Sequence, residues 1–465
     1  MFAGMNDEQI FKMIGALADD LSVEVYVIGG YVRDRLLNKE SHDIDFVVLG
    51  DAPGFARRLA DHWKIDNIVV YENFGTAMIP YHGYILEFVT ARSESYQETS
   101  RNPIVEKADL KTDVMRRDFT VNTLAFGLNK NNFGKLIDLL DGKTDLENKI
   151  LKTPLDPVQT FYDDPLRIMR VIRFSAQLGF EIDPVVYQSI FEVVDRLKII
   201  SVERISEEFF KTMETAKPSI GLDLLKKTGI LKVILPELDR LDIQDYEEHD
   251  SHHKNVWEHT LKVLDRVAEQ SNDLALRLAA LFHDVGKFPT REFREGKGWT
   301  FYNHELVGSK MIPPIFIRMR WPKDLGKKVK KLVYLHMRPI ALTEEQVTDS
   351  AVRRLIVKAD EDLDDLMLLT RCDLTSANPR RVAEKQEKFQ FVLRRLAEVR
   401  EKDKLRAFQS PVRGDEIMAL ANLQPGKQVG HYKHLIEEAI LEGIIPNEYE
   451  AAKEYLLGLL QGEGK

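Results

Sequence analysis

The sequence has little cysteine, no excess of positive charge and no long apolar run. Cys372 is the single cysteine among 465 residues, which excludes an internal disulfide and a cysteine-based zinc site. Lys and Arg number 66 against 75 Asp and Glu, so the net charge is −9 and bulk positive charge cannot hold a nucleic acid. A local basic groove remains compatible with this total. No apolar run approaches about 18 residues and no signal-peptide order is present, so we expect a cytoplasmic protein without a membrane partner.

The pattern of residues divides the chain into an α/β part and a longer all-α part. Strand patterns lie at 23–28, 43–48, 68–71, 76–79 and 84–90, and helical patterns lie at 8–21, 31–37 and 55–62. They predict a small mixed sheet with a few helices, followed by a loop at 92–113. From about residue 163 the pattern is helical. Composition shifts at 153–157, at 242–250 and near 378–379 indicate boundaries between segments.

Two aspartates stand beside a glycine turn in the α/β part. Asp43 and Asp45 are two apart on a predicted strand, so both carboxylates point to one face. Hard oxygen ligands at that spacing can hold Mg²⁺, which activates an attacking hydroxyl and neutralises a leaving phosphate. An isolated Asp-x-Asp motif is more often part of a solvent-exposed strand face. Here Gly29 and Gly30 end the preceding strand and open a helix, where backbone N–H groups can approach a triphosphate.

This block resembles a known enzyme superfamily. The run Gly-Gly-Tyr-Val-Arg-Asp at 29–34, followed by Asp-Ile-Asp at 43–45, is similar to the nucleotidyltransferases that include polymerase β. Its form resembles the bacterial-type branch, which holds tRNA nucleotidyltransferases (CCA-adding enzymes) and poly(A) polymerases. The resemblance implies metal binding by Asp43 and Asp45, triphosphate binding by Gly29, Gly30 and Arg33, and a third carboxylate at Glu87.

Further motifs of the branch follow in order. The run Arg-Arg-Asp-Phe-Thr-Val-Asn at 116–122 offers Arg117 to phosphate, and Asp118 and Asn122 to a ribose hydroxyl. The runs at 138–146 and 203–208 resemble structural motifs of the branch.

The helix predicted after Pro165 carries three arginines. Arg167, Arg170 and Arg173 are spaced three apart and share one helix face, which suits a wall facing phosphate or a base. The resemblance implies that Asp164 and Arg167 select the incoming base by hydrogen bonding to its edge, with Arg170 and Arg173 helping to bind the nucleotide. The family usually has Glu where this chain has Asp163, so we assign Asp163 no base-reading role.

Histidines cluster in the helical part, where seven of the twelve fall between 249 and 336. A lone histidine there is more often a core residue, but adjacent buried His and Asp side chains need partners that a metal can supply. The set His259, His283, Asp284 and Asp373 resembles the four ligands of the HD superfamily of metal-dependent phosphohydrolases. Such ligands suit Mn, Fe, Co, Ni or Zn. In two-metal members of the superfamily, additional histidines bind the second metal, and the resemblance places His304 and His336 in that role. Lys287 could hold a phosphate.

Two stretches are locally basic and are candidate tRNA contacts, although each can equally be a solvated helix. Residues 318–331 contain seven basic residues and one acid, and residues 380–406 contain ten basic and five acidic residues.

We therefore predict an α/β plus all-α multidomain chain of four parts. These are a polymerase-β-like mixed-sheet nucleotidyltransferase head at 1–152, a helical neck at 153–240, an HD-type helical domain at 241–378 and a helical RNA-binding tail at 379–465. The head is expected to add CCA to the tRNA 3′ end from CTP and ATP, with Mg²⁺. The alternatives are a poly(A) polymerase, an enzyme that adds only CC or only A, an HD phosphohydrolase with an RNA-binding head, and a pure RNA-binding scaffold.

Overall fold

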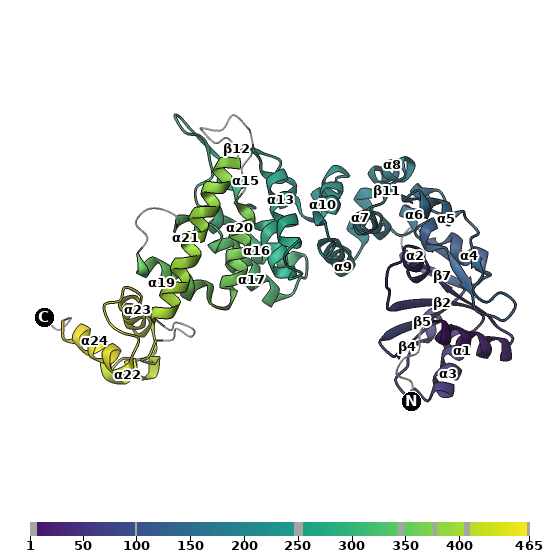
Figure 1. Cartoon of the computed structure of the whole chain (residues 1–465), viewed down its shortest axis with the longest axis horizontal. Helices are drawn as coiled ribbons and strands as arrows, with labels where there is room; N and C mark the ends of the chain where they lie inside the picture. Colours follow the sequence, from purple (N-terminus) through teal and green to yellow (C-terminus); the bar gives the residue numbers. More distant parts are fainter. Residues whose placement is uncertain are drawn as a thin grey trace. The chain divides into compact units, whose positions relative to one another are not determined.

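The chain forms two compact units, Met1–Pro236 and Glu237–Lys465, in a computed structural model (Figure 1). The structure describes residues 7–97, 100–245, 254–342, 348–374, 379–403 and 410–462. None of the helices within these ranges is long and apolar enough to cross a membrane. The predicted boundary at 242–250 and the one near 378–379 fall partly outside these ranges.

A seven-stranded sheet organises the first unit, in the order β3-β4-β5-β2-β1-β8-β9. Only β2 and β5 run parallel, so the sheet is mixed, as predicted. The strands are β1 Glu24–Ile28, β2 Asp43–Leu49, β3 Val69–Tyr71, β4 Thr76–Tyr81, β5 Tyr84–Thr90, β8 Ala125–Gly127 and β9 Leu136–Ile137.

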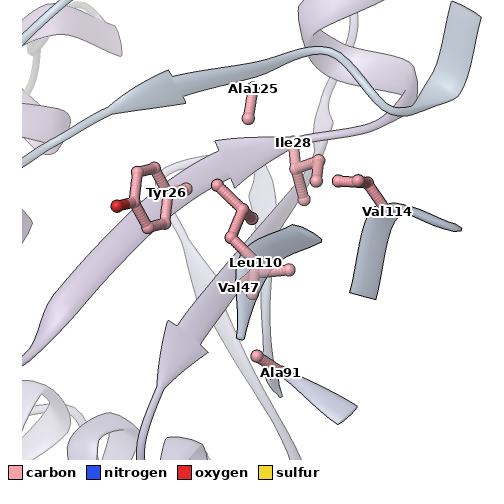
Figure 2. Close-up of a cluster of buried hydrophobic side chains, with 7 residues drawn as sticks. All are labelled: Tyr26, Ile28, Val47, Ala91, Leu110, Val114 and Ala125. Carbon is pink, nitrogen blue, oxygen red and sulfur yellow. The ribbon is translucent and has the colours of Figure 1, made fainter. Parts of the chain in front are cut away.

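Both faces of this sheet are covered. On one face Phe46 of β2 stacks on Phe88 of β5, and α1 (Asp7–Asp20) and α3 (Ala52–Trp63) bring Phe11 and Phe55 against these rings. On the other face Tyr26, Ile28 and other buried side chains form a second cluster that receives α4 (Leu110–Met115) (Figure 2). Because Phe46, Val47 and Val48 bury β2 on both sides, its position is fixed, while Asp43 at its N-terminal end is exposed.

The segment 92–113, expected as a loop, is instead a hairpin followed by α4. Strands β6 (Arg92–Gln97) and β7 (Ser100–Lys107) pair antiparallel with an irregularity between residues 95 and 97. The expectation was wrong because this segment is mostly polar and lacks the regular alternation of apolar and polar residues that distinguishes a strand from a loop.

The rest of the first unit is mostly helical, as predicted, with one short parallel pair of strands, β10 and β11. Two of its helices, α6 and α8, begin with an aspartate cap and a proline in the first turn, at Asp156-Pro157 and Asp183-Pro184. The elements are α2 Gly30–Leu36, the 3₁₀ turn η2 Thr120–Asn122, α5 Gly142–Glu147, β10 Ile150–Leu151, α6 Pro157–Asp163, α7 Leu166–Leu178, β11 Glu181–Ile182, α8 Pro184–Val193, α9 Val202–Met213, α10 Pro218–Lys227 and α11 Ile230–Ile234.

The second unit is built almost wholly of helices, again as predicted. Its C-terminal helices have a small core of their own, centred on Ile417, Tyr432 and Ile436. The elements are α12 Pro236–Asp239, β12 Gln244–Asp245, β13 Lys254–Asn255, α13 Val256–Ala268, α14 Leu274–Phe282, α15 Lys287–Thr290, β14 Glu292–Arg294, β15 Gly298–Thr300, α16 His304–Arg318, α17 Lys323–Leu335, α18 Arg338–Ala341, α19 Asp349–Ala359, α20 Leu363–Asp373, α21 Pro379–Asp403, α22 Gly414–Ala421, α23 Lys427–Leu441 and α24 Tyr449–Gly462.

Candidate functional site

Three carboxylates occupy neighbouring positions on β2 and β5. Asp43 and Asp45 lie two apart on β2, and the parallel register places Glu87 of β5 beside Asp45. Asp45 and Glu87 line a cavity of about 390 Å³ in the first unit. Burial raises the pKa of Asp45, against the charge of Arg117, and burial together with Asp45 raises the pKa of Glu87. Crowded oxygen ligands whose charges repel are the donor set that a divalent cation such as Mg²⁺ fits.

The glycine turn approaches these carboxylates closely. Gly29 has a φ of 85°, and a Cβ on it would lie 3.3 Å from both Asp45 Oδ2 and Arg117 Nη1. Its N–H donates to the carbonyl of Leu124 at 3.2 Å, so that group is already used within the fold. Gly30 begins α2, and neither glycine lines the cavity formed by the described residues.

Two arginines enter the cavity from the motif at 116–122, held by one buried aspartate. Arg116 Nη2 donates to Asp113 Oδ1 at 2.6 Å, and Arg117 Nη2 donates to Asp113 Oδ2 at 3.2 Å. Burial opposes ionisation of Asp113, but the charges of Arg117 and Arg116 outweigh it and lower the pKa. Each carboxylate oxygen therefore fixes one guanidinium, and both guanidinium groups line the cavity.

Asp118 links this motif to α7. Its carboxylate accepts from Arg170 Nη2 at 2.6 Å and from Asn122 Nδ2 at 2.9 Å. Burial opposes ionisation, but the charge of Arg170 and these hydrogen bonds lower the pKa of Asp118 to about 2. Asp118 and Arg170 line the cavity, whereas Asn122 lies behind them.

The structure places two of the predicted phosphate-binding arginines behind the cavity wall. Arg33 is 4% exposed and binds Asp34 and Asn122, and Arg173 donates to the buried Glu208 at 2.6 Å. Both guanidinium groups lie against the ring of Phe174, at 5.0 and 4.0 Å from its centroid. Neither side chain lines the cavity among the described residues, so both stiffen the wall that Arg170 presents.

The residues predicted to read the base lie together at the start of α7. Arg167 Nη2 donates to the carbonyl of Arg116 at 2.7 Å, and Asp164 Oδ2 accepts from Arg204 Nη2 at 3.0 Å. All three of Asp164, Arg167 and Arg204 line the cavity. From the sequence, Arg204 is expected only in a structural motif. The available signal was its spacing from Glu208, four residues on, which places two opposite charges on one face of the amphipathic helix α9.

Six histidine and aspartate side chains converge inside the second unit. His259 of α13, His283 after α14 and Asp373 at the end of α20 offer ligand atoms within 4.8 Å of one another. A second group with the same spacing combines Asp284 with the residues predicted as extra ligands, His304 and His336.

Asp284 lies between these two groups. Its Oδ2 is 3.2 Å from His283 Nε2, and its Oδ1 is 3.5 Å from His304 Nε2. Two adjacent sites that share one carboxylate suit a pair of metal ions.

The histidine rings are oriented for metal binding. The Nδ1 atoms of His283, His304 and His336 lie 2.8, 3.0 and 2.7 Å from the backbone carbonyls of Ala280, Phe301 and Val333. Because a carbonyl can only accept, each Nδ1 carries the proton and each Nε2 is left to face the cluster. The buried Asp284 Oδ2 has no hydrogen-bond partner in the described chain, although Lys287 Nζ lies 3.1 Å away. The donor set therefore fits a transition metal.

Protonation in this cluster follows burial and charge. Burial lowers the pKa of His336 to about 3, which keeps that ring neutral. For His283 burial is opposed and outweighed by the charge of Asp284, which raises the pKa to about 9. A metal ion therefore has to displace a proton from His283, as deprotonated ligands require.

The basic stretch at 318–331 is mostly engaged in ion pairs. Lys328 Nζ lies 2.8 Å from Asp273 and 2.6 Å from Asp365, Lys331 pairs with Asp362, and Arg318 with Glu237. Lys323 and Lys330 form no ion pair among the described residues. The stretch at 380–406 falls on α21 as far as residue 403, and the remainder lies outside the described residues.

These two sites define a class: a nucleotidyltransferase head joined to a metal-binding helical domain. Family models support both halves. A poly(A) polymerase head domain matches residues 25–152, a probable RNA-binding region of polymerase A matches 179–241, and an HD domain matches 256–378.

Individual relatives define the family of this chain more narrowly than the domain models do. The chain is 30% identical to the CC-adding tRNA nucleotidyltransferase of Thermus thermophilus, over 93% of each chain. It is 30% identical to the A-adding enzyme of Deinococcus radiodurans, over 91% of this chain and 93% of that one. It is also 30% identical to the multifunctional CCA protein of Vibrio parahaemolyticus, over 76% and 85%. The chain belongs to the tRNA nucleotidyltransferase family, whose members are enzymes.

A solved structure agrees with this membership. A tRNA nucleotidyltransferase, crystallised with a primer tRNA and an incoming ATP analogue, is 26% identical and superposes with a TM-score of 0.60. The match covers 83% of this chain and 99% of that chain.

Proposed function

We propose that this chain adds the nucleotides CCA to the 3′ end of tRNA, using CTP and ATP and releasing pyrophosphate. The observation that carries the proposal is a single cavity that unites Asp45 and Glu87 with Arg117, Asp164 and Arg167. Carboxylates for a metal, arginines for phosphate and an Asp–Arg pair for a base are what nucleotidyl transfer requires. The relatives and the solved tRNA complex support tRNA as the acceptor.

The catalytic roles follow from the position of each side chain. Asp43 and Asp45 would hold Mg²⁺, which supplies charge neutralisation at the triphosphate. Arg116 and Arg117, fixed by Asp113, hold the triphosphate oxygens. The tRNA 3′-hydroxyl attacks the α-phosphorus, an oxygen–phosphorus bond forms, and the bond to pyrophosphate breaks on the opposite side.

The base-reading pair is suited to C and A together. Cytosine and adenine each present an exocyclic amine, which donates, next to a ring nitrogen, which accepts. Asp164 accepts hydrogen bonds and Arg167 donates them, so the same pair satisfies both bases. Uracil and guanine present a carbonyl where the amine would be and leave Asp164 without a donor. One cavity can therefore select CTP and then ATP.

The decisive experiment separates full CCA addition from its alternatives. Transcripts of tRNA that end before CCA, after C and after CC are incubated with Mg²⁺ and with CTP, ATP or both. We expect all three to be completed to CCA. Extension that stops after CC, or that occurs only with A on the CC-ended transcript, would assign the chain to the split-specificity enzymes, and a long A tail would assign it to poly(A) polymerases. No extension in any tube contradicts the proposal.

The helical unit favours a second function, metal-dependent hydrolysis of a phosphoester. The carrying observation is the set of three histidines whose Nδ1 protons are fixed, which leaves each Nε2 free to face the cluster that contains Asp284 and Asp373. A bound transition metal would supply an activated water. Lys287, 3.1 Å from Asp284, is placed to bind the phosphate.

Elemental analysis tests this second function. The purified chain is expected to carry Mn, Fe, Co, Ni or Zn, and His283→Ala to lose it together with hydrolysis of 4-nitrophenyl phosphate. A protein without such a metal would contradict the assignment and leave the helical unit as a scaffold for RNA.

A further inference from the structure

A short hairpin in the second unit carries exposed aromatic side chains that the proposed functions do not use. Strands β14 and β15 pair Phe293 directly with Trp299, and the two rings meet edge to face with centroids 5.4 Å apart. Phe293 is 65% exposed and Tyr302, just beyond the hairpin, is 53% exposed. Large rings are seldom left in water without a partner to cover them.

Cationic side chains accompany these rings. The guanidinium of Arg291 lies 3.9 Å from the ring centroid of Trp299, and that of Arg294 lies 4.8 Å from the ring centroid of Tyr302. Residues 287–302 contain four basic and two acidic residues in a chain whose total charge is −9. Arg291 and Lys297 form no ion pair with any residue that the structure describes. The hairpin is therefore locally positive and aromatic.

The hairpin is continuous with the metal ligands. Asp284 precedes it and His304 follows it, and the carbonyl of Phe301 accepts from His304 Nδ1 at 3.0 Å. The Lys287 ammonium lies 5.5 Å from the ring centroid of Phe301 and 3.1 Å from Asp284 Oδ2. The Lys287 ammonium therefore lies between the hairpin and the cluster, where it can attract the phosphate of a ligand that is stacked on the hairpin.

We propose that the hairpin at 291–301 is a stacking platform for single-stranded RNA, which directs a phosphate-terminated RNA end to the histidine–aspartate cluster. Bases stack on exposed rings whatever their sequence, arginine adds cation–π attraction, and free cations bind the backbone. The substrate assignment rests on the proposed hydrolytic function, whereas the stacking itself does not.

Photocrosslinking tests the platform without requiring hydrolysis. The probe is a ten-nucleotide single-stranded RNA with 4-thiouridine at the penultimate position and a 3′-phosphate, mixed with the full chain below saturation. We expect a crosslink within residues 291–302, located by mass spectrometry. Phe293→Ala should reduce its yield about tenfold, the effect of losing one stacked base, and Phe293→Tyr should retain it.

A matched control removes a different exposed apolar side chain. Ile317 on α16 is 78% exposed in the same unit, and Ile317→Ala should leave the crosslink unchanged. Unchanged metal content in Phe293→Ala shows that the unit still folds. Equal yields from the wild type and Phe293→Ala, or crosslinks confined to other segments, would overturn the platform. Self-association that Phe293→Ala abolishes, without an RNA crosslink, would instead assign the surface to a second copy of the chain.

The two proposals fail in distinguishable ways. A hairpin crosslink in a protein that hydrolyses no phosphoester refutes the hydrolytic function and leaves the platform standing. Hydrolysis of 4-nitrophenyl phosphate without a hairpin crosslink refutes the platform alone. If both hold, Phe293→Ala should raise KM for the 3′-phosphorylated RNA about tenfold and leave the rate on 4-nitrophenyl phosphate unchanged.

Discussion

At the scale of single residues, the position of Gly29 leaves no room for a larger side chain beside the candidate site of the head. A Cβ there would press on Asp45 and Arg117 at 3.3 Å, and the φ of 85° disfavours any other residue. We expect Gly29→Ala to lower the rate of nucleotide addition about a hundredfold, because it displaces groups that must align with the triphosphate. Primer-extension kinetics at saturating CTP measure this.

Gly83 provides the matched control for this substitution. It has a φ of 86° in the turn between β4 and β5, and a Cβ on it would meet nothing within 4 Å. Gly83→Ala therefore carries a backbone cost without the crowding and should keep nearly full activity. Equal losses in the two variants would show that backbone strain, rather than contact with the site, explains the effect of Gly29→Ala.

Asp118 contributes stability that depends on pH. Its pKa falls from 3.8 to about 2 on folding, because its hydrogen bonds and ion pair with Arg170 outweigh burial. A lowered folded-state pKa stabilises the fold above the unfolded value, by about 2 kcal/mol at pH 7, and this contribution is lost as pH falls from about 4 to 2. Amide hydrogen exchange in α7 should show that the Asp118→Asn substitution lowers the free energy of unfolding by that amount at pH 7. A deficit that persists at pH 2 would contradict this.

The sequence predicts which residues belong to the candidate site of the head, but it does not predict which of them face the cavity. Asp43, Asp45, Asp164 and Arg167 are found by spacing and motif, and the structure brings Asp45, Asp164 and Arg167 to one cavity. Nothing in a motif distinguishes an arginine that faces the cavity from one that supports it. That difference depends on burial against Phe174 and Glu208, which are contributed by different helices.

At the scale of elements, α17 shows that a basic stretch is not automatically a nucleic-acid surface. Lys328 is bound by Asp273 and Asp365, so Lys328→Ala should destabilise the second unit by about 1 kcal/mol and leave tRNA affinity nearly unchanged. Lys330 has no such partner in the described chain, and Lys330→Ala should reduce the salt dependence of tRNA binding by about one unit of log–log slope. Filter binding at several salt concentrations measures the tRNA affinity of both variants, and urea denaturation measures the stability of Lys328→Ala. The reverse pattern of affinities would mean that the ion pairs of Lys328 open to bind RNA.

Elements with a buried face are predictable, and exposed hairpins are not. Strand β5 occupies residues 84–90, as its alternation predicts, and α3 extends the predicted helix by only a few residues. Strands β14 and β15 are exposed or half-exposed along their length, so no period-two apolar pattern marks them. The hairpin at 291–301 is therefore not predictable from the sequence pattern, although its aromatic and basic residues are evident in the sequence.

At the scale of the whole molecule, the net charge of −9 is an average over unlike surfaces. Some of the acidic residues lie at the two candidate metal sites, namely Asp43, Asp45, Asp284 and Asp373. Positive charge is available where arginines line the head cavity and where Arg291 and Lys297 mark the hairpin. Recognition of RNA by this chain should therefore depend on local shape and charge rather than on overall attraction.

The division into two compact units, each with its own candidate site, predicts independent loss of function. Asp43→Ala should abolish nucleotide addition to tRNA, because β2 then presents one carboxylate fewer to the metal, and should leave the metal content of the second unit intact. His283→Ala should release that metal and retain nucleotide addition within about twofold. Asp43→Asn controls for volume and should be equally inactive. Because no ligand atom is shared between the sites, a single substitution that removed both activities would show that tRNA must engage both units before either can act.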